Sequence, residues 1–221
     1  MEGLSAAILD RRAFIRDNTR LLRPPLAPRL RLYLADEAVA LWQKTEEELG
    51  RIGLPPPFWA FAWAGGQALA RYLLDHPEEV AGRQVIDFAT GSGIVAIAAM
   101  KAGAAQALAA DIDPFCAAAV ALNAAANGVA VDFTDANLLD ASPPAADLIL
   151  AADICYEQPL AERVMVWLAE ARRAGTRVLV GDPGRSYFPK SGLVHLAEYR
   201  VPTTRELEDA EIKRTSVWAL P

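Results

Sequence analysis

From residue 84 onward, the chain alternates short apolar runs with longer segments whose apolar residues recur at helical spacing. This alternation constrains the possible folds more than any other feature. Strands separated by helices favour a parallel, doubly wound α/β sheet, because each helix returns the chain across one face of the sheet. The predicted strands are 85–89, 107–111, 129–133, 147–151 and 178–181, with helices over 94–101, 114–126 and 159–171.

The last part of the chain breaks this alternation. Residues 196–201 and 215–220 are both typical of strands, and the charged stretch 204–214 joins them without an apolar crossover helix. Two strands joined in this way are expected to pair as an antiparallel hairpin. We therefore predict a Rossmann-like seven-stranded sheet that is mostly parallel and ends in an antiparallel hairpin.

The N-terminal part has a different pattern. Apolar residues at helical spacing predict helices over 3–20 and 36–49, with a proline-rich break between them. Three further prolines at 55–57 form a stiff connector. We predict an N-terminal helical extension over 1–57 and one catalytic domain over 58–221.

Composition excludes several functional classes. The 22 Lys and Arg residues against 28 Asp and Glu give a net charge of −6, which disfavours a nucleic-acid partner. No apolar run is long enough to span a membrane, and the N-terminal residues contain no continuous apolar signal segment. The two cysteines and two histidines cannot form a zinc cluster or a disulfide framework. We expect a cytoplasmic protein without a metal, and favour a monomer.

A loop of small residues follows the first predicted strand of the sheet. Gly91 and Gly93 allow a ligand to approach the backbone amides at the start of a helix. The dinucleotide pattern GxGxxG is not met, and Asp87 would repel a pyrophosphate. Asp87 could instead accept hydrogen bonds from the amino group of a ligand, or from the amides of its own loop.

A second acid lies at the end of the next predicted strand. Asp111 is placed where the fold would hold a ribose diol, whereas Asp113 could instead cap the helix that begins at Pro114. After the third strand, Asp135 and Asn137 are candidates to line an adenine pocket, with turn residues as the alternative. A glycine loop with one acid, followed by a second acid, suits a nucleoside that carries an amino-acid tail.

These residues resemble the seven-strand (class I) S-adenosylmethionine-dependent methyltransferases. The E/DxGxGxG loop of that family matches residues 87–93, with Ala89 in place of the first glycine, and the terminal hairpin also matches. The resemblance implies S-adenosylmethionine as cofactor and a cofactor site of the following residues: Trp63, Asp87, Ala89, Gly91, Gly93, Asp111, Ile112, Asp135 and Asn137.

Three further segments, 57–72, 152–156 and 181–185, resemble the family of lysine methyltransferases of the electron-transfer flavoprotein beta subunit. This similarity runs from about residue 18 to the end of the chain. Asp153 and Tyr156 match the D/E-x-x-Y/F motif of the protein-lysine branch, and the segment differs from the Asn/Asp-Pro-Pro-Tyr motif of nucleobase and glutamine methylases. The resemblance implies that Asp153 orients a lysine of that beta subunit, with Tyr156 and Trp63 around it.

Several alternatives remain at this point. The chain could methylate another protein, such as a ribosomal protein, or it could be a cofactor-binding interaction module without activity. Trp63 could simply pack in its aromatic segment. Asp182 and Arg185 could pair with each other or lie at the rim of the substrate pocket, and Cys155 is expected to be a packing residue.

Overall fold

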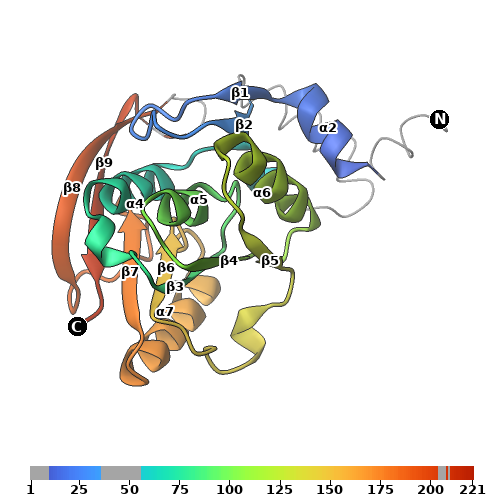
Figure 1. The fold of residues 1–221 in the computed structure, drawn as a ribbon. Coiled ribbons are helices and arrows are strands. Elements are labelled where there is room, and N and C mark those ends of the chain that lie inside the picture. The colour runs from blue at the N-terminus through green and yellow to red at the C-terminus, as the bar shows by residue number, and fades with distance from the viewer. Residues whose placement is uncertain (1–9, 36–55, 204–207, 209) are drawn as a thin grey trace.

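The computed structural model describes residues 10–35, 56–203, 208 and 210–221. Its centre is a seven-stranded sheet with the strand order β5-β4-β3-β6-β7-β9-β8 (Figure 1). The strands are β3 (Gln84–Phe88), β4 (Gln106–Ala110), β5 (Asp132–Thr134), β6 (Leu148–Ala152), β7 (Arg177–Asp182), β8 (Val194–Pro202) and β9 (Ile212–Ala219). Strands β3 to β7 are parallel, and β9 is antiparallel to both β7 and β8. The predicted sheet and its terminal hairpin are therefore confirmed.

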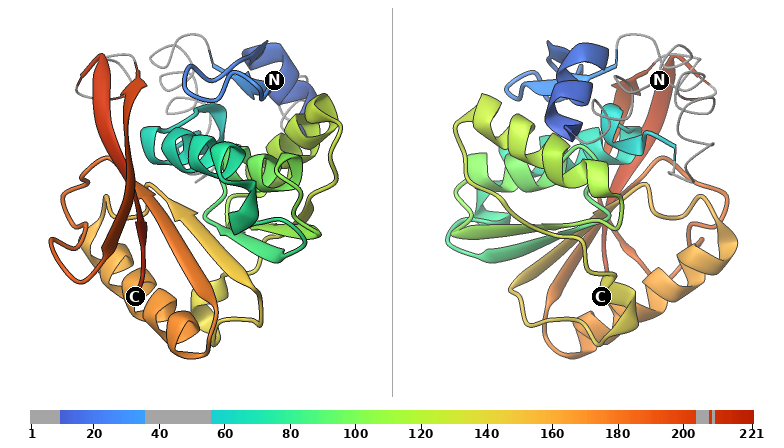
Figure 2. Two further views of the ribbon diagram at one scale, coloured as in Figure 1. Left: turned by 60° about the vertical axis from the view of Figure 1, so that its left-hand side comes forward. Right: turned by 90° about the vertical axis from the view of Figure 1, so that its right-hand side faces the viewer.

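Helices cover both faces of the sheet. One face carries α4 (Ala64–Asp75), α5 (Ile94–Lys101) and α6 (Pro114–Asn127), and the other carries α7 (Gln158–Arg173) (Figures 1 and 2). Three short 3-10 turns cover Phe58–Ala60, Pro77–Glu79 and Leu138–Asp140. Within the described ranges, no helix is both long and apolar enough to cross a membrane.

The apolar runs of the central strands are continuous because both of their faces are buried. In β6, Leu148 and Leu150 belong to the core that includes α4 and α5. The intervening Ile149 and Ala151 belong to the core beneath α7. Successive side chains of a strand point to opposite faces, so this single run of residues joins the two layers.

The N-terminal extension contains strands as well as a helix. Helix α2 (Arg11–Asn18) lies within the first predicted helix, but β1 (Arg20–Leu22) and β2 (Leu32–Leu34) follow it as an antiparallel pair. The predicted proline-rich break after the first helix thus contains a pair of strands, and the alternating side chains of Leu32 and Leu34 are buried against the α4 core. The second predicted helix, 36–49, lies outside the described residues, and the domain boundary at residue 57 stays a prediction.

Candidate active site

The candidate site lies at the carboxyl ends of the parallel strands. Strand β3 has β4 on one side and β6 on the other, so the strand order reverses at β3. Open α/β sheets bind ligands in the crevice at such a switch point. Most of the predicted site residues lie at the end of β3 or in the loops after β3, β4, β5 and β6, and therefore meet at one edge of the sheet: Asp87, Ala89, Gly91, Gly93, Asp111, Ile112, Asp135, Asn137, Asp153 and Tyr156.

The loop after β3 is tightly wound. Gly91 and Gly93 have φ angles of 52° and 80°, a region that glycine tolerates and other residues rarely adopt. A Cβ atom on Gly93 would also lie 3.0 Å from Val120 Cγ2. Ala89 has a φ of 53° and therefore holds a left-handed conformation without being glycine. The side chain at this position is small, but its backbone conformation is costly.

Asp87 organises this loop from inside the protein. Its side chain is 1% exposed, and Oδ2 accepts hydrogen bonds from the Thr90 hydroxyl and from the Ala96 amide at 3.0 Å. Burial raises the pKa of Asp87 to about 7, although both hydrogen bonds act in the opposite direction. This geometry matches the loop-organising alternative, and a contact with the amino group of a ligand stays a prediction.

Asp111 links the end of β4 to the glycine loop. Its Oδ2 accepts from the Gly91 amide at 2.9 Å, and its Oδ1 accepts from the Asp113 amide at 3.0 Å. Asp113 itself caps α6 by accepting from the Phe115 amide at 2.8 Å, as one of the two alternatives predicted. Ile112 stands between the two acids with 69% of its surface exposed, which is unusual for a large apolar side chain.

The loop after β5 is less organised around the site. Asp135 and Asn137 are both exposed. Asn137 accepts from the Leu139 amide at 3.2 Å and so caps a 3-10 turn, as the turn alternative predicted. A role in an adenine pocket stays a prediction for both residues. Together, residues 87–93 with Asp111 and Ile112 form what we call the glycine-loop side of the site.

The other half of the site is built around Asp153, which follows β6. Asp153 has a φ of 55°, and its side chain is 11% exposed. Its Oδ2 accepts from the Gly66 amide at 2.9 Å, and its Oδ1 accepts from Arg185 Nη2 at 2.7 Å. Burial raises the pKa of Asp153 although both of these partners favour the charged form.

Two glycines permit this arrangement. A Cβ atom on Gly65 would lie 2.4 Å from the Gly181 carbonyl oxygen and 2.6 Å from Asp153 Oδ2. A Cβ on Gly181 would in turn lie 2.4 Å from the Gly65 carbonyl oxygen. The start of α4, the end of β7 and Asp153 therefore meet at backbone contact, which fixes the aromatic segment before α4 over the site.

Arg185 joins this cluster from the loop after β7. Besides Asp153, its guanidinium contacts Glu208 through Nη2 at 2.8 Å and Nη1 at 3.0 Å. Burial alone lowers the pKa of Arg185, but Asp153 and Glu208 raise it above its ordinary value, so the group stays charged. Nothing in the residue spacing predicted Glu208, since it belongs to the charged connection of the terminal hairpin and reaches the site only through the fold.

Asp182, at the end of β7, does not pair with the Arg185 guanidinium. Its Oδ1 accepts from the backbone amides of Gly184 and Arg185 at 2.7 and 2.8 Å. Burial raises the pKa of Asp182 to about 7. Asp153, Asp182, Arg185 and Glu208 form what we call the ion-pair side of the site.

Aromatic side chains adjoin the ion-pair side. The Trp63 ring lies 5.9 Å from that of Phe58 and 5.7 Å from the Arg185 guanidinium carbon, and its Nε1 donates to the Phe58 carbonyl at 3.0 Å. Tyr156 lies 5.9 Å from Phe58 and is 49% exposed. Cys155 is buried, and burial raises its pKa to about 12, so it packs as predicted rather than forming a thiolate.

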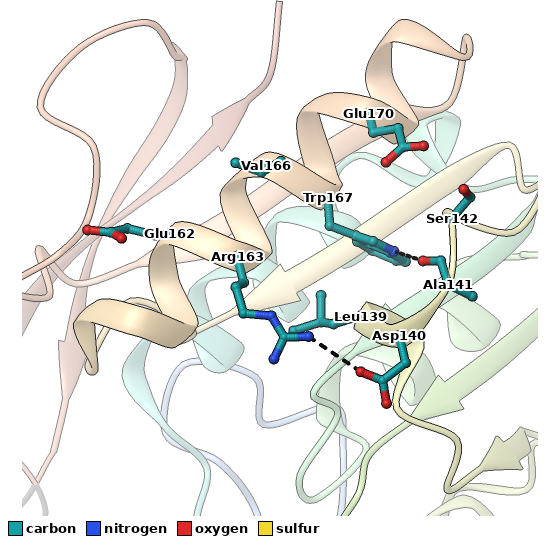
Figure 3. A pocket seen from close by; sticks show the side chains of 9 residues that line it. All are labelled: Leu139, Asp140, Ala141, Ser142, Glu162, Arg163, Val166, Trp167 and Glu170. Carbon is teal, nitrogen blue, oxygen red and sulfur yellow. Dashed lines mark hydrogen bonds and ion pairs between the residues drawn. The ribbon is translucent and has the colours of Figure 1, made fainter.

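A separate groove of about 550 Å³ lies between α7 and the connection before β6 (Figure 3). Trp167 donates to the Ala141 carbonyl across it, and Arg163 lies 3.4 Å from Asp140. None of the predicted site residues lines this groove, so we assign it no part in the site. In the described part of the chain, no group of three or more His, Cys, Asp and Glu residues is arranged to hold a metal ion.

Comparison with known proteins adds three findings. Residues 67–169 match the sequence profile of the ribosomal protein L11 methyltransferase family (PrmA). The electron transfer flavoprotein beta subunit lysine methyltransferases of Rattus norvegicus and Danio rerio are 36% and 37% identical to this chain, and each alignment covers 95% of it. The alignments cover 84% and 83% of those relatives.

A likeness to solved structures agrees with the fold. The crystal structure of magnesium protoporphyrin IX methyltransferase from Synechocystis PCC 6803 with bound S-adenosylmethionine aligns with a TM-score of 0.52. The alignment covers 80% of this chain and 83% of that chain at 16% identity. At this identity the likeness establishes the methyltransferase fold alone.

Proposed function

Because this chain belongs to the family of electron transfer flavoprotein beta subunit lysine methyltransferases, we propose that it methylates lysine side chains of that beta subunit. S-adenosylmethionine is the proposed methyl donor. The observation that carries the proposal is the position of Asp153 and Tyr156 beside the glycine-loop side, at the reversal point of the strand order. An acceptor and a donor bound on the two sides would meet there.

The glycine-loop side fits S-adenosylmethionine. Its small residues let a ligand approach the backbone of the loop closely. The Asp111 carboxylate, which already accepts from the Gly91 amide, can also accept hydrogen bonds from ribose hydroxyls. The exposed Ile112 side chain offers an apolar surface to an adenine ring. The proposed cofactor residues are Trp63, Asp87, Ala89, Gly91, Gly93, Asp111, Ile112, Asp135 and Asn137.

The reaction requires alignment and a neutral amine. When bound, the cofactor supplies an electrophilic methyl group on a sulfonium. Lysine has an ordinary pKa of ~10.4, so exposing its lone pair at pH 7 costs roughly 4.6 kcal/mol. We propose that Asp153 aims the amine by accepting from an N–H group, and that Phe58, Trp63 and Tyr156 enclose the alkyl stem. The ammonium proton leaves to water.

The alternative of a ribosomal protein substrate is supported by less of the chain. The L11 methyltransferase profile ends at residue 169, before Asp182, Arg185 and Glu208. The lysine methyltransferase relatives align over 95% of the chain. We therefore place the specificity for the acceptor in the part of the chain that only the second comparison covers.

The decisive experiment presents both acceptors to the purified protein. Purified electron-transfer flavoprotein beta subunit and ribosomal protein L11 are incubated separately with S-adenosylmethionine and this protein, then digested and examined by mass spectrometry. We expect lysine peptides of the beta subunit to gain mass in steps of roughly 14 Da, one CH₂ each. Methylation of L11 with an unmodified beta subunit would establish the alternative, and no methylation of either would favour a non-catalytic module.

We further propose that the protein acts in the cytoplasm as a monomer, without a membrane or nucleic-acid partner. The net charge of −6 supports the part of this proposal that concerns nucleic acid, because it gives no general attraction for phosphates. Light scattering coupled to size-exclusion chromatography should give a mass near the 23.8 kDa of one chain. A doubled mass would contradict the monomer.

A further inference from the structure

We propose that Arg185 is a positioning residue for methyl transfer, because its fixed positive charge offsets that of Asp153 and lets Asp153 orient a neutral lysine amine. This inference rests on the proposed function. It assigns to Arg185 the part of the reaction that Asp153 cannot perform alone, namely keeping the acceptor in its reactive protonation state.

An isolated carboxylate would work against the reaction. A negative charge beside a lysine stabilises the ammonium form, which has no lone pair with which to attack. In the reactive form, the amine nitrogen donates its lone pair to the methyl carbon, and the new C–N bond forms as the C–S bond breaks. The bonding electron pair goes to sulfur, and the proton that lysine gave up has already passed to water.

The guanidinium is held where it can offset Asp153. It lies 2.7 Å from Asp153 Oδ1 and makes two contacts to Glu208, and its carbon lies 5.7 Å from the Trp63 ring. The side chain is 19% exposed, and its backbone amide is anchored to Asp182. An incoming ammonium could displace Arg185 only by breaking a largely buried ion pair, which is strongly unfavourable.

A charge count supports this arrangement. Two carboxylates, Asp153 and Glu208, face two cations, Arg185 and Lys213, whose Nζ lies 3.9 Å from Glu208 Oε2. These four charges sum to zero when Asp182, whose pKa is raised to about 7, is protonated, and removing Arg185 makes the sum more negative by one at any pH. The negative charge of Asp153 also raises the pKa of Cys155 and of Asp182, and Glu157 and Asp111 raise the pKa of Tyr156 beside it.

The ion-pair side lowers the stability of the folded protein. Among the described residues, the buried side-chain atoms without a hydrogen-bond partner are Asp182 Oδ2 and Arg185 Nε, and both belong to the ion-pair side. Buried polar atoms left unsatisfied destabilise a protein, and buried ion pairs are weak contributors to stability. Such an arrangement is typical of a functional site rather than of a structural one.

The test is the pH dependence of kcat for Arg185→Gln, measured in short assays from pH 6.5 to 9.5 with the purified beta subunit. In a plot of kcat against pH, we expect the rising part of the curve (the rising limb) to move to higher pH by about one to two units. The reason is that loss of a nearby positive charge stabilises the ammonium form of the acceptor lysine. The kcat at pH 7 should therefore fall about 10- to 100-fold and recover toward high pH. Arg185→Lys, which keeps the charge, should leave the limb near its original position.

Two further variants make the result specific. Arg177→Gln is the matched control, because Arg177 forms an ion pair of similar geometry with Glu79, at 2.8 Å for both contacts, at the opposite end of β7. It should not move the limb. Glu208→Gln removes a negative charge from the cluster and should shift the limb to lower pH, opposite to Arg185→Gln.

Thermal melting and cofactor binding show whether each variant is folded, and Glu208→Gln decides the matter if Arg185→Gln does not fold. A limb that stays in place in Arg185→Gln, with kcat reduced equally at every pH, overturns the inference. So does a Glu208→Gln limb that does not move to lower pH. If the unmodified protein transfers no methyl group at any pH, the proposed function fails, and this inference fails with it.

Discussion

The two sides of the site hold their carboxylates in different ways. On the glycine-loop side, Asp87 and Asp111 accept mainly from backbone amides, and each partner lies within 20 residues along the chain. On the ion-pair side, Asp153 accepts from Gly66, 87 residues away, and from the guanidinium of Arg185, 32 residues away. One side is thus a local motif, whereas the other is assembled by the tertiary fold. The local glycine-loop side suits the proposed cofactor, which stays the same from one acceptor to another. The assembled ion-pair side suits the acceptor, which varies.

Loss of Asp153 should give the largest effect. Asp153→Ala removes the group proposed to aim the amine and leaves Arg185 paired with Glu208 alone, so methyl transfer should fall by about 100-fold or more. Cofactor affinity, measured by calorimetry, should change less than about twofold, because the cofactor is proposed to bind on the other side. Asp153→Asn should be nearly as damaging. Transfer at the unmodified rate in either variant would remove Asp153 from the site.

Loss of the corresponding acid on the glycine-loop side should affect cofactor binding more than methyl transfer. Asp111→Ala removes a charged acceptor proposed for the ribose hydroxyls and also frees the Gly91 amide. Cofactor binding should weaken about tenfold or more. At saturating cofactor, transfer to lysine should largely recover. Unchanged affinity for the cofactor in a folded Asp111→Ala protein would show that Asp111 does not bind the cofactor.

Both sides contain a buried carboxyl whose pKa is raised to about 7, Asp87 and Asp182. A carboxyl whose pKa is higher in the folded than in the unfolded state binds extra protons when folded, so its contribution to stability is lost as pH rises from about 4 to 7. Asp182→Asn cannot titrate, so urea unfolding at pH 5 and pH 8 should show a pH dependence smaller by about 1 kcal/mol or more. An unchanged pH dependence would mean that Asp182 ionises normally.

The smallest effect is expected at Ala89. Glycine at this position relieves the left-handed φ of 53°, a gain of about 1–2 kcal/mol that is partly offset by the greater entropy of the unfolded chain. Ala89→Gly should therefore stabilise the protein by at most about 1 kcal/mol in urea unfolding. Ala121→Gly, in the middle of α6, serves as the control and should destabilise it by a similar amount. Destabilisation by both variants would contradict the strain at Ala89.

The sequence indicates the arrangement of the glycine-loop side more directly than that of the ion-pair side, because the first is local and the second is assembled by the tertiary fold. The features of the glycine-loop side follow one another along the chain: a strand, a loop of small residues, a helix and a second acid. The parallel sheet then requires these segments to meet. Asp153 and Tyr156 could be identified through a motif, but the pairing of Arg185 with Asp153 and Glu208 depends on how distant segments pack. In the extension, periodicity predicted α2, whereas β1 and β2 lie in the predicted break between two helices, and the burial of alternate leucines in β2 depends on packing against the α4 core.

The position of β9 has a consequence for synthesis. Strand β9 is the last strand along the described chain, yet it lies inside the sheet between β7 and β8. A chain that leaves the ribosome N-terminus first therefore exposes the edge of β7 until β9 has emerged, and an unpaired edge of this kind invites aggregation. Glu208 and Lys213 arrive with the same hairpin, so a nascent chain could complete the glycine-loop side well before the ion-pair side exists.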